Sequence, residues 1–489
     1  MRTLLVDLNN FSRYPTLSIG YLTAILRNAG HDVEVLSPLF FGVHGFPRQV
    51  REKPWQKYSR FLSHWSAVTT FKPVHSARDS LKRKRQIISG ESAATILDAV
   101  KKSLVSKPDV VLISAYTMYF DVCVEIAALC RQQNIPVIVG GNSFVEPEIA
   151  ERWAKTNGIA AVFSGEPEPV LLDLVTKVAQ GEDVRHISGV YDKSKSGNFA
   201  AAPLQTLDAV PFPDFSDFPW DCYPNRIIPI MTGRGCEWGR CTFCSDVLMS
   251  AGRTFRSRSL ENVLQEIQYQ HQRFGADLFV FLDLKLNSDL QVWRGLIANI
   301  QRVAPGVRWT ASIHVDSRQD NGLSAEDLQR AAQAGLVRTT CGLESGSQRV
   351  LSSMAKGVKL ERMSAFIKDA SNAGISVRLT SIVGYPSEEI EDIEKTTNFI
   401  AEHSDYIERV MLNRFTVMPG TPAQEQLKKQ VYPHIAVANL DVDYAVIPHR
   451  NQRLAKTRNL MATYRLIRVT NQINRKPLLE KASAFEGAF

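Results

Sequence analysis

The sequence predicts two α/β domains in tandem, a doubly wound parallel sheet followed by a partial barrel of six β/α units. Short apolar runs alternate with segments of helical periodicity up to about residue 180. A proline-rich stretch then breaks the pattern, and the alternation resumes six times after it. Strands that are apolar throughout are buried on both faces, as in parallel sheets that are covered by helices.

The first domain is predicted over residues 1–180. Its apolar runs are short enough for strands, whereas the segments between them repeat apolar residues every three or four positions. The expected strands are 3–9, 32–38, 110–116, 136–142 and 160–166. The expected helices are 18–29, 92–106, 121–133, 147–156 and 167–179. Together they predict a Rossmann-like sheet with helices on both faces.

Residues 181–225 are predicted as a stiff linker, because prolines recur there and no periodic pattern does. The second domain is predicted over residues 226–430, and residues 431–489 are expected to be a C-terminal extension of mixed character. Its expected strands are 228–234, 276–286, 308–316, 339–345, 376–384 and 407–418. A helix is expected after each of the first five, for example at 259–273 and 388–402. In such sheets the functional residues gather at the carboxyl ends of the strands.

The charge of the chain is concentrated in one segment. The 489 residues carry a net charge of +8, and 44% of them are hydrophobic, which excludes a disordered or collagen-like chain. Residues 48–85 hold eleven basic and two acidic residues, a net charge of +9, whereas the rest of the chain holds 47 basic and 48 acidic residues. The basic insert, residues 45–90, therefore interrupts a nearly neutral protein.

Aromatic residues are interleaved with the basic residues of this insert, at Trp55, Tyr58, Phe61, Trp65 and Phe71. The insert could be an amphipathic helical excursion whose aromatic residues pack onto the first domain. It could instead receive an acidic precursor peptide or a phosphorylated metabolite. Nucleic-acid binding through phosphate contacts and base stacking is a third, less favoured possibility.

The cysteines and the N-terminus predict a cytoplasmic protein. Seven cysteines are too few and too uneven for a secreted disulfide framework. The N-terminal residues lack the pattern of a signal peptide. No stretch approaches the 18 or more apolar residues that a membrane span requires.

Three cysteines, Cys236, Cys241 and Cys244, lie in the segment Gly233-Arg-Gly-Cys-Glu-Trp-Gly-Arg-Cys-Thr-Phe-Cys-Ser, directly after the first strand expected in the second domain. Three thiolates from one loop can hold three corners of a 4Fe-4S cluster and leave the fourth iron open to another ligand. The alternative is a structural zinc site. Such sites have four protein ligands, and the nearest candidates for the fourth, Cys222 and His271, lie outside the loop.

Further segments accompany the cysteine loop in a fixed order. They are Arg256-Ser-Arg-Ser259, Leu278-Phe-Val-Phe-Leu-Asp283, Cys341-Gly-Leu-Glu-Ser-Gly346, Met354-Ala-Lys-Gly357, Ile382-Val-Gly-Tyr-Pro-Ser-Glu388 and Pro419-Gly-Thr-Pro422. In this series, residues 226–425 resemble the radical S-adenosylmethionine (SAM) superfamily, and particularly its cobalamin-binding branch. The cysteine spacing is C-x4-C-x2-C, where the family usually has C-x3-C-x2-C.

The resemblance implies roles for several residues of the second domain. The three cysteines would bind the 4Fe-4S cluster, and Phe243 would pack beside the SAM adenine. Glu344 and Ser345 would face polar groups of SAM, and Arg378 would pair with its carboxylate. The cluster, reduced by an electron donor such as flavodoxin or ferredoxin, would cleave SAM to a 5′-deoxyadenosyl radical that abstracts a hydrogen from the substrate.

The first domain is expected to bind a ligand at the carboxyl ends of its strands. No G-x-G-x-x-G follows the first strand, which argues against a dinucleotide. With Leu17-Ser-Ile-Gly-Tyr-Leu22 at the start of its first helix, the domain resembles the cobalamin-binding domain of this branch. The expected cobalamin contacts are Asn9, Ser114, Tyr116, Thr117, Gly140, Gly141, Asn142, Gly165 and Glu166. The alternative is a cofactor-free domain in which the glycines only form turns.

In other cobalamin proteins a D-x-H-x-x-G motif places a histidine on the cobalt. This sequence lacks the motif, as the resemblance to this branch implies, so the lower face of the cobalt is expected to have no histidine ligand from the protein. The cofactor pair implies a C-methyltransferase that acts on an unactivated carbon of a peptide or natural product through methylcobalamin. The cysteine loop resembles that of radical SAM enzymes of peptide natural-product maturation, and this resemblance favours a peptide substrate. A non-methylating cyclase or rearrangement enzyme remains an alternative within the family, and a zinc-stabilised nucleic-acid-binding protein is the alternative of another class.

Overall fold

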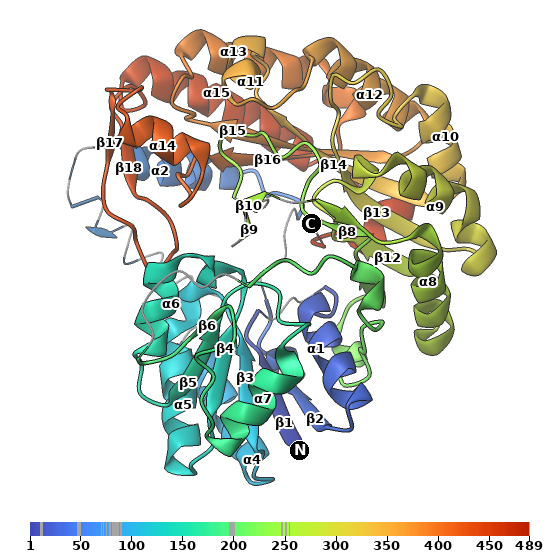
Figure 1. Cartoon of the computed structure of the whole chain (residues 1–489). Coiled ribbons are helices and arrows are strands. Elements are labelled where there is room, and N and C mark those ends of the chain that lie inside the picture. Colours follow the sequence, from blue (N-terminus) through green and yellow to red (C-terminus); the bar gives the residue numbers. More distant parts are fainter. Residues whose placement is uncertain are drawn as a thin grey trace.

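The computed structural model describes residues 1–9, 13–45, 50–69, 90–194, 201–245 and 255–488, with isolated positions between these ranges (71, 73, 74, 76, 77, 80, 88, 248, 249, 252 and 253). It contains two α/β domains, each built on a six-stranded sheet, with the second lying above the first in Figure 1. The predicted fold class is confirmed. Among the described residues, no helix combines the length and the apolarity that a membrane crossing would need.

The sheet of the first domain has the order β2-β1-β3-β4-β5-β6. Its parallel strands are β1 (Arg2–Asp7), β2 (Asp32–Leu36), β3 (Val110–Ser114), β4 (Val137–Gly140) and β5 (Ile159–Phe163). The sequence does not predict β6 (Val190–Tyr191), which pairs antiparallel with β5, because two residues show no periodicity. The strand order reverses between β1 and β3, so this is the switch point at which such sheets bind ligands.

Helices cover both faces of this sheet. On one face lie α1 (Leu17–Asn28) and α7 (Leu171–Gln180), and on the other lie α4 (Gly90–Leu104), α5 (Phe120–Gln132) and α6 (Pro147–Ala154). Successive residues of β1 alternate between the two cores, with Leu5 in the first and Leu4 and Val6 in the second. This two-sided burial explains why the strands are apolar throughout.

The sheet of the second domain has the order β16-β15-β14-β13-β12-β7 and is parallel. Its strands are β7 (Ile227–Ile230), β12 (Leu278–Phe281), β13 (Arg308–Ile313), β14 (Leu336–Glu344), β15 (Ser376–Val383) and β16 (Arg409–Arg414). The helices between them are α8 (Leu260–Phe274), α9 (Leu290–Val303), α10 (Ala325–Gln333), α11 (Gln348–Ser353), α12 (Leu360–Asn372) and α13 (Ile390–Glu402). As described, the sheet ends at β7 and β16, so the barrel is partial.

The linker packs between the domains rather than spanning open space. Phe215 is completely buried, and it fits against Gly20 of α1, where an added Cβ would lie 2.5 Å from the Phe215 ring. Asp214 forms an ion pair of 2.8 Å with Arg27 of α1, and Gln270 of α8 donates to the Pro213 carbonyl. The linker therefore belongs to the core that joins the two sheets.

The C-terminal extension contains regular structure that packs on the partial barrel. It contains β17 (Ile435–Val437), β18 (His449–Asn451) and α15 (Thr457–Asn474), and α14 (Pro422–Lys428) lies just before it. The helix α15 packs on α13 and β16. Near the end of the chain, Ala482 and Phe485 pack against Ile227 of β7 and Leu278 of β12.

Residues 50–69 of the basic insert pack on this extension, whereas Ile88 packs in the core of the first domain. The helix α2 (Gln56–Val68) lies against α15, where Tyr58 and Phe61 contact the Tyr464 ring at centroid distances of 6.4 and 5.3 Å. The expectation that the aromatic residues of the insert pack onto the first domain is therefore wrong for α2. Packing between segments about 400 residues apart leaves no signal in a local sequence pattern.

Candidate active site

The three cysteines of the loop lie beyond the carboxyl end of β7. They follow the short strand β8 (Gly233–Arg234), which pairs with β11 (Arg256–Ser257), and all three are half-buried. Three thiols on one loop suit an iron–sulfur cluster, in which each thiolate binds a different iron atom. Among the described residues, no three His, Cys, Asp or Glu side chains are grouped as a single metal ion would require.

The first half of the loop is anchored by the residues between Cys236 and Cys241. The Trp238 indole donates to the Ala355 carbonyl at 2.9 Å and lies so close to Gly357 that a Cβ there would be 2.1 Å from the ring. Glu237 accepts a hydrogen bond of 2.7 Å from Arg318. These contacts explain how a loop with one residue more than the usual spacing holds a defined shape.

The second half of the loop is held by Thr242. Its amide donates to the Met354 carbonyl at 3.0 Å, and its hydroxyl lies 2.8 Å from the Tyr385 hydroxyl. Phe243 packs at the edge of the same core. The loop therefore rests on two of the segments that the sequence singles out, Met354–Gly357 and Ile382–Glu388.

Glu344 and Lys356 form a buried ion pair beside the loop. The Lys356 ammonium lies 3.0 Å from Glu344 Oε1 and 5.8 Å from the centre of the Phe243 ring. Burial lowers the pKa of Lys356, but Glu344 and then Cys241 outweigh burial, so the pKa stays above its ordinary value and the side chain is charged. A Cβ on Gly342 would lie 2.0 Å from Glu344 Oε1, so a side chain at this position would displace the ion pair.

The sequence prediction missed Lys356 as a site residue, although it lies within the segment Met354–Gly357 that it singles out. Its role becomes visible only when the turn after α11 brings the ammonium against Glu344, at the end of β14.

The structure does not bring Ser345 to this site. Its side chain is completely buried, its hydroxyl lies 3.2 Å from Thr396 Oγ1, and it accepts from the Ser347 amide. The neighbouring Gly346 explains this orientation, because it packs directly on the backbone of α13 at Thr396. Ser345 therefore fixes the chain to α13 instead of facing a ligand of the loop.

Arg378 also lies away from the cysteine loop. It is the third of the eight residues of β15 and pairs in register with Arg409, about 16 Å along the strand from its carboxyl end. Its Nε lies 3.8 Å from Glu408, and the side chain is completely buried. The expected pairing of Arg378 with a carboxylate of SAM is therefore not supported.

The expected cobalamin contacts of the first domain lie at adjacent strand ends. The Asn9 amide donates to Ser114 Oγ at 2.9 Å, which joins the ends of β1 and β3 at the switch point. Asn9 Oδ1 is buried without a hydrogen-bond partner among the described residues. A Cβ on Gly140 would meet nothing within 4 Å, so open space lies over the end of β4. An open cradle with an unsatisfied acceptor suits a large ligand with amide donors.

The other expected cobalamin contacts differ in burial and in backbone conformation. Gly141 has a φ of 150° and lies so close to Ala115 that any Cβ would be 2.5 Å from its carbonyl oxygen, so this glycine is required by the fold. Asn142 is exposed, Tyr116 and Gly165 are half-buried, and Thr117 is buried at the start of a short helix.

Glu166 has a different environment from the one expected of a ligand contact. Its carboxylate forms hydrogen bonds of 2.7 and 2.8 Å with Arg256 and lies 3.2 Å from Arg234. Burial raises the pKa of Glu166, but the two arginines and the Leu204 amide outweigh it and hold the pKa below its ordinary value. Glu166 therefore joins the first domain to β8 and β11, next to the cysteine loop.

Comparison with known proteins agrees with this geometry. Residues 230–400 match the family model of the radical SAM superfamily. The chain is 30% identical over 324 residues to a protein of Pyrococcus horikoshii named uncharacterized methyltransferase PH0819, covering 64% of this chain and 68% of that protein. It is 26% identical over 319 residues to the anaerobic magnesium-protoporphyrin IX monomethyl ester cyclase of Rubrivivax gelatinosus, covering 61% of this chain and 55% of the cyclase.

A solved structure with a similar fold is the radical SAM methyltransferase TsrM from Kitasatospora setae, with cobalamin and a [4Fe-4S] cluster bound. The TM-score is 0.65 at 16% sequence identity, and the alignment covers 92% of this chain and 84% of TsrM. The likeness therefore includes both domains and their order along the chain.

Proposed function

Because the chain belongs to the radical SAM superfamily and has the fold of its cobalamin-dependent members, we propose that it is a cobalamin-dependent C-methyltransferase. The observation that carries the proposal is the contact of Glu166 with Arg234 and Arg256. This contact holds the cysteine loop against the domain whose strand ends form the open cradle. A cluster and a corrin bound at these two places would face the same space.

The residues of the second domain suit the binding of a cluster and SAM. Cys236, Cys241 and Cys244 would hold the cluster, and the Lys356–Glu344 pair would present one charge of each sign beside it. Such a pair complements the carboxylate and the ammonium of an amino-acid ligand. Phe243, between Cys241 and Cys244 in the loop, supplies an apolar surface for an aromatic base.

The residues of the first domain suit cobalamin. Asn9, Ser114, Gly140 and Gly141 would lie under the corrin, and the free Oδ1 of Asn9 would accept from one of its amides. When bound, the cluster and SAM supply a radical that removes a hydrogen atom from the substrate, and cobalamin supplies the methyl group. The protein orients these groups and limits the access of water to them.

The substrate proposed for this reaction belongs to one of two classes. A small natural product or a peptide fits the family, and an electron donor such as flavodoxin or ferredoxin would reduce the cluster. We place the reaction in the cytoplasm, because reduced thiolates persist there.

Anaerobic reconstitution tests the proposal. We expect about four irons and four sulfides per chain, the uptake of one cobalamin, and the transfer of label from methyl-labelled SAM to a product. Replacement of Cys236, Cys241 and Cys244 by alanine should abolish cluster uptake, whereas Cys222→Ala should not, since Cys222 is exposed outside the loop. Cleavage of SAM with a product of unchanged carbon count would exclude methyl transfer.

A non-methylating cyclase is the second candidate, and the similarity to the Rubrivivax cyclase favours it. The two candidates differ in the mass of the product, because only methylation adds a carbon. The alternative of a zinc-stabilised nucleic-acid-binding protein gains no support from the family match.

A further inference from the structure

The helix α2 of the basic insert exposes apolar side chains along one side, although Phe61 and Val68 of the same helix face inward. Its solvent face carries Trp55, Tyr58, Leu62 and Trp65, whose exposed fractions are 58, 54, 56 and 37%. Their spacing of three and four residues places them on one stripe, although Trp55 is the residue that caps the helix. We call these four residues the aromatic stripe. A contiguous exposed apolar patch of this kind is typical of an interaction surface.

Polar contacts join the packing of Phe61 and Val68 on the inward side of α2. Arg60 donates to Thr470 Oγ1 of α15 at 2.9 Å and pairs with Glu52 at 3.1 Å. Glu52 in turn accepts from Asn471 at 2.6 Å and from Asn474 at 3.2 Å. The helix is thus fixed to α15 by Arg60 and by the packing of Phe61 on Tyr464, and the fold presents the aromatic stripe to solvent.

Basic side chains of α15 lie next to the stripe. Tyr464, which contacts Tyr58, has Met461 one turn before it and Arg468 one turn after it, and both of these are exposed. Arg458 and Arg465 are exposed on the same helix, although Arg465 is partly neutralised by Glu394 at 3.6 Å. Neither α2 nor α15 contains an acidic residue.

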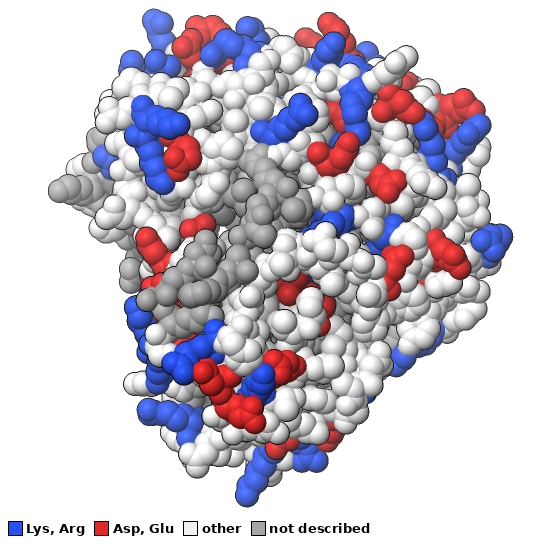
Figure 2. All heavy atoms as spheres, viewed as in Figure 1, with Lys and Arg blue, Asp and Glu red and all other residues white. Residues whose placement is uncertain are grey.

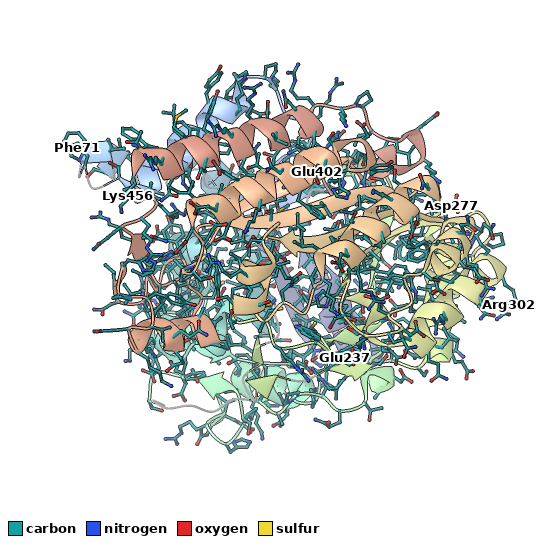
Figure 3. All side chains as sticks on the ribbon, turned by 90° about the horizontal axis from the view of Figure 1, so that it is seen from above. Phe71, Glu237, Asp277, Arg302, Glu402 and Lys456 are labelled. Carbon is teal, nitrogen blue, oxygen red and sulfur yellow. The ribbon has the colours of Figure 1, made fainter. Side chains whose placement is uncertain are left out.

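The charge pattern of the edge formed by α2 and α15 differs from that of the face shown in Figure 2. On the face shown in Figure 2, basic and acidic side chains are interspersed. The helices α2 and α15, in contrast, carry basic side chains and no acidic side chain. Seen from above in Figure 3, Phe71 and Lys456 lie at one edge of the molecule, and Arg302 lies at the opposite edge. Phe71, 62% exposed, extends the apolar surface at this edge.

We propose that the edge formed by α2 and α15 docks on a bilayer surface that contains anionic lipid. The stripe residues would enter the interfacial region, where the amphipathic rings of Trp and Tyr are favoured. Lys57, Arg458 and Arg468 would lie at the level of the lipid phosphates. Basic residues beside an apolar helix face add electrostatic attraction to anionic headgroups.

Two features favour a membrane over an acidic peptide. The stripe lies on a helix at the outer edge of the molecule, which can enter a soft interface without a groove to receive it. Its side chains are two indoles, a phenol and a leucine, the composition of interfacial anchors. The proposal concerns a surface away from the cysteine loop, and it stands whether or not the proposed reaction is correct.

Vesicle flotation of the full-length reconstituted protein tests this proposal. We expect it to float with vesicles of phosphatidylcholine and phosphatidylglycerol, to bind pure phosphatidylcholine much more weakly, and to be released by salt. Replacement of Trp55 and Trp65 together by alanine should weaken binding by at least about tenfold. Arg458→Gln with Arg468→Gln should weaken it about 30-fold, which corresponds to about 1 kcal/mol for each arginine.

The matched controls are Arg302→Gln, at the opposite edge, and Val105→Ala, an apolar residue that is 80% exposed on another surface. Both variants should bind like the parent protein. Brominated lipids should quench tryptophan fluorescence in the parent protein and quench it less in the tryptophan double variant. Absence of binding to anionic vesicles at low salt, or binding unchanged in the tryptophan variant, would overturn the proposal. The proposal would also be overturned if these residues bound an acidic peptide, nucleic acid or a second copy of the chain while the protein did not bind vesicles.

Discussion

The contact of Glu166 with Arg256 and Arg234 gives the most direct test of how the two domains are held together. The carboxylate side chain is 7% exposed and that of Arg256 is 8% exposed, and two hydrogen bonds of 2.7 and 2.8 Å join them. Glu166→Gln keeps the size of the side chain and removes its charge. Removing one partner of a buried pair costs about 3–5 kcal/mol, because the other charge stays buried.

We expect a loss near the lower end of this range, about 3 kcal/mol, because Arg234 keeps Glu168 at 2.5 Å. For a domain of this size the loss corresponds to a fall in Tm of roughly 6–12 °C. Circular dichroism during urea and thermal unfolding of the full chain measures both quantities. The control is Glu326→Gln, whose partner Arg330 lies at 2.5 Å but whose pair is mostly exposed. It should cost no more than about 0.5 kcal/mol.

The effect of Glu166→Gln should depend on pH with a defined sign. Because the folded protein lowers the pKa of Glu166, the charged form contributes stability at neutral pH, and this contribution is lost as the pH falls through the folded pKa. The difference between parent and variant should therefore shrink in acid. A variant that unfolds with the parent at pH 7, or a difference that grows in acid, would refute the assignment of this contact as a clamp between the domains.

Three further predictions concern the second domain. Gly357→Ala should lower the iron and sulfide content of the reconstituted protein, because a Cβ there would lie 2.1 Å from the Trp238 ring. The control is Gly306→Ala, which has a similar positive φ but nothing within 4 Å of the added Cβ, and it should leave the iron and sulfide content unchanged. Lys356→Met should lower the reduction potential of the cluster on the order of 50 mV in a redox titration followed by electron paramagnetic resonance, because a positive charge beside Cys241 and Cys244 is lost. An unchanged potential would exclude this role, and exposed Lys368→Met is the control. Burial raises the pKa of Glu388 to about 8, so its contribution to stability is lost as the pH rises from about 4.5 to 8. Glu388→Gln should not show this decline in Tm, and parallel pH profiles of parent and variant would contradict the assignment.

The order of strands and helices could be predicted from the sequence because local rules determine it. Each apolar run that becomes β1, β3, β4 or β5 is buried on both sides, and this burial alone makes its sequence uniformly apolar. The position of the cysteine loop after the first strand of the second sheet follows from the chain order in the same way.

The partners of individual polar side chains could not be predicted in this way. Glu166 lies at a strand end, as expected, but its carboxylate turns to arginines of the other domain. Ser345 and Arg378 have the residue types that a SAM site needs, yet each is fully buried among neighbours supplied by other elements. Lys356 became a site residue only through its ion pair with Glu344.

The basic insert shows the same division most clearly. Its composition, aromatic residues among lysines and arginines, was evident from the sequence, and so was the concentration of charge in residues 48–85. Only the tertiary structure decided that α2 packs on α15, about 400 residues away, and that Arg60 and Phe61 face inward while the aromatic stripe faces solvent. The sequence determined which side chains the helix has, because these are local, whereas its orientation depends on partners that meet it only when the chain is folded.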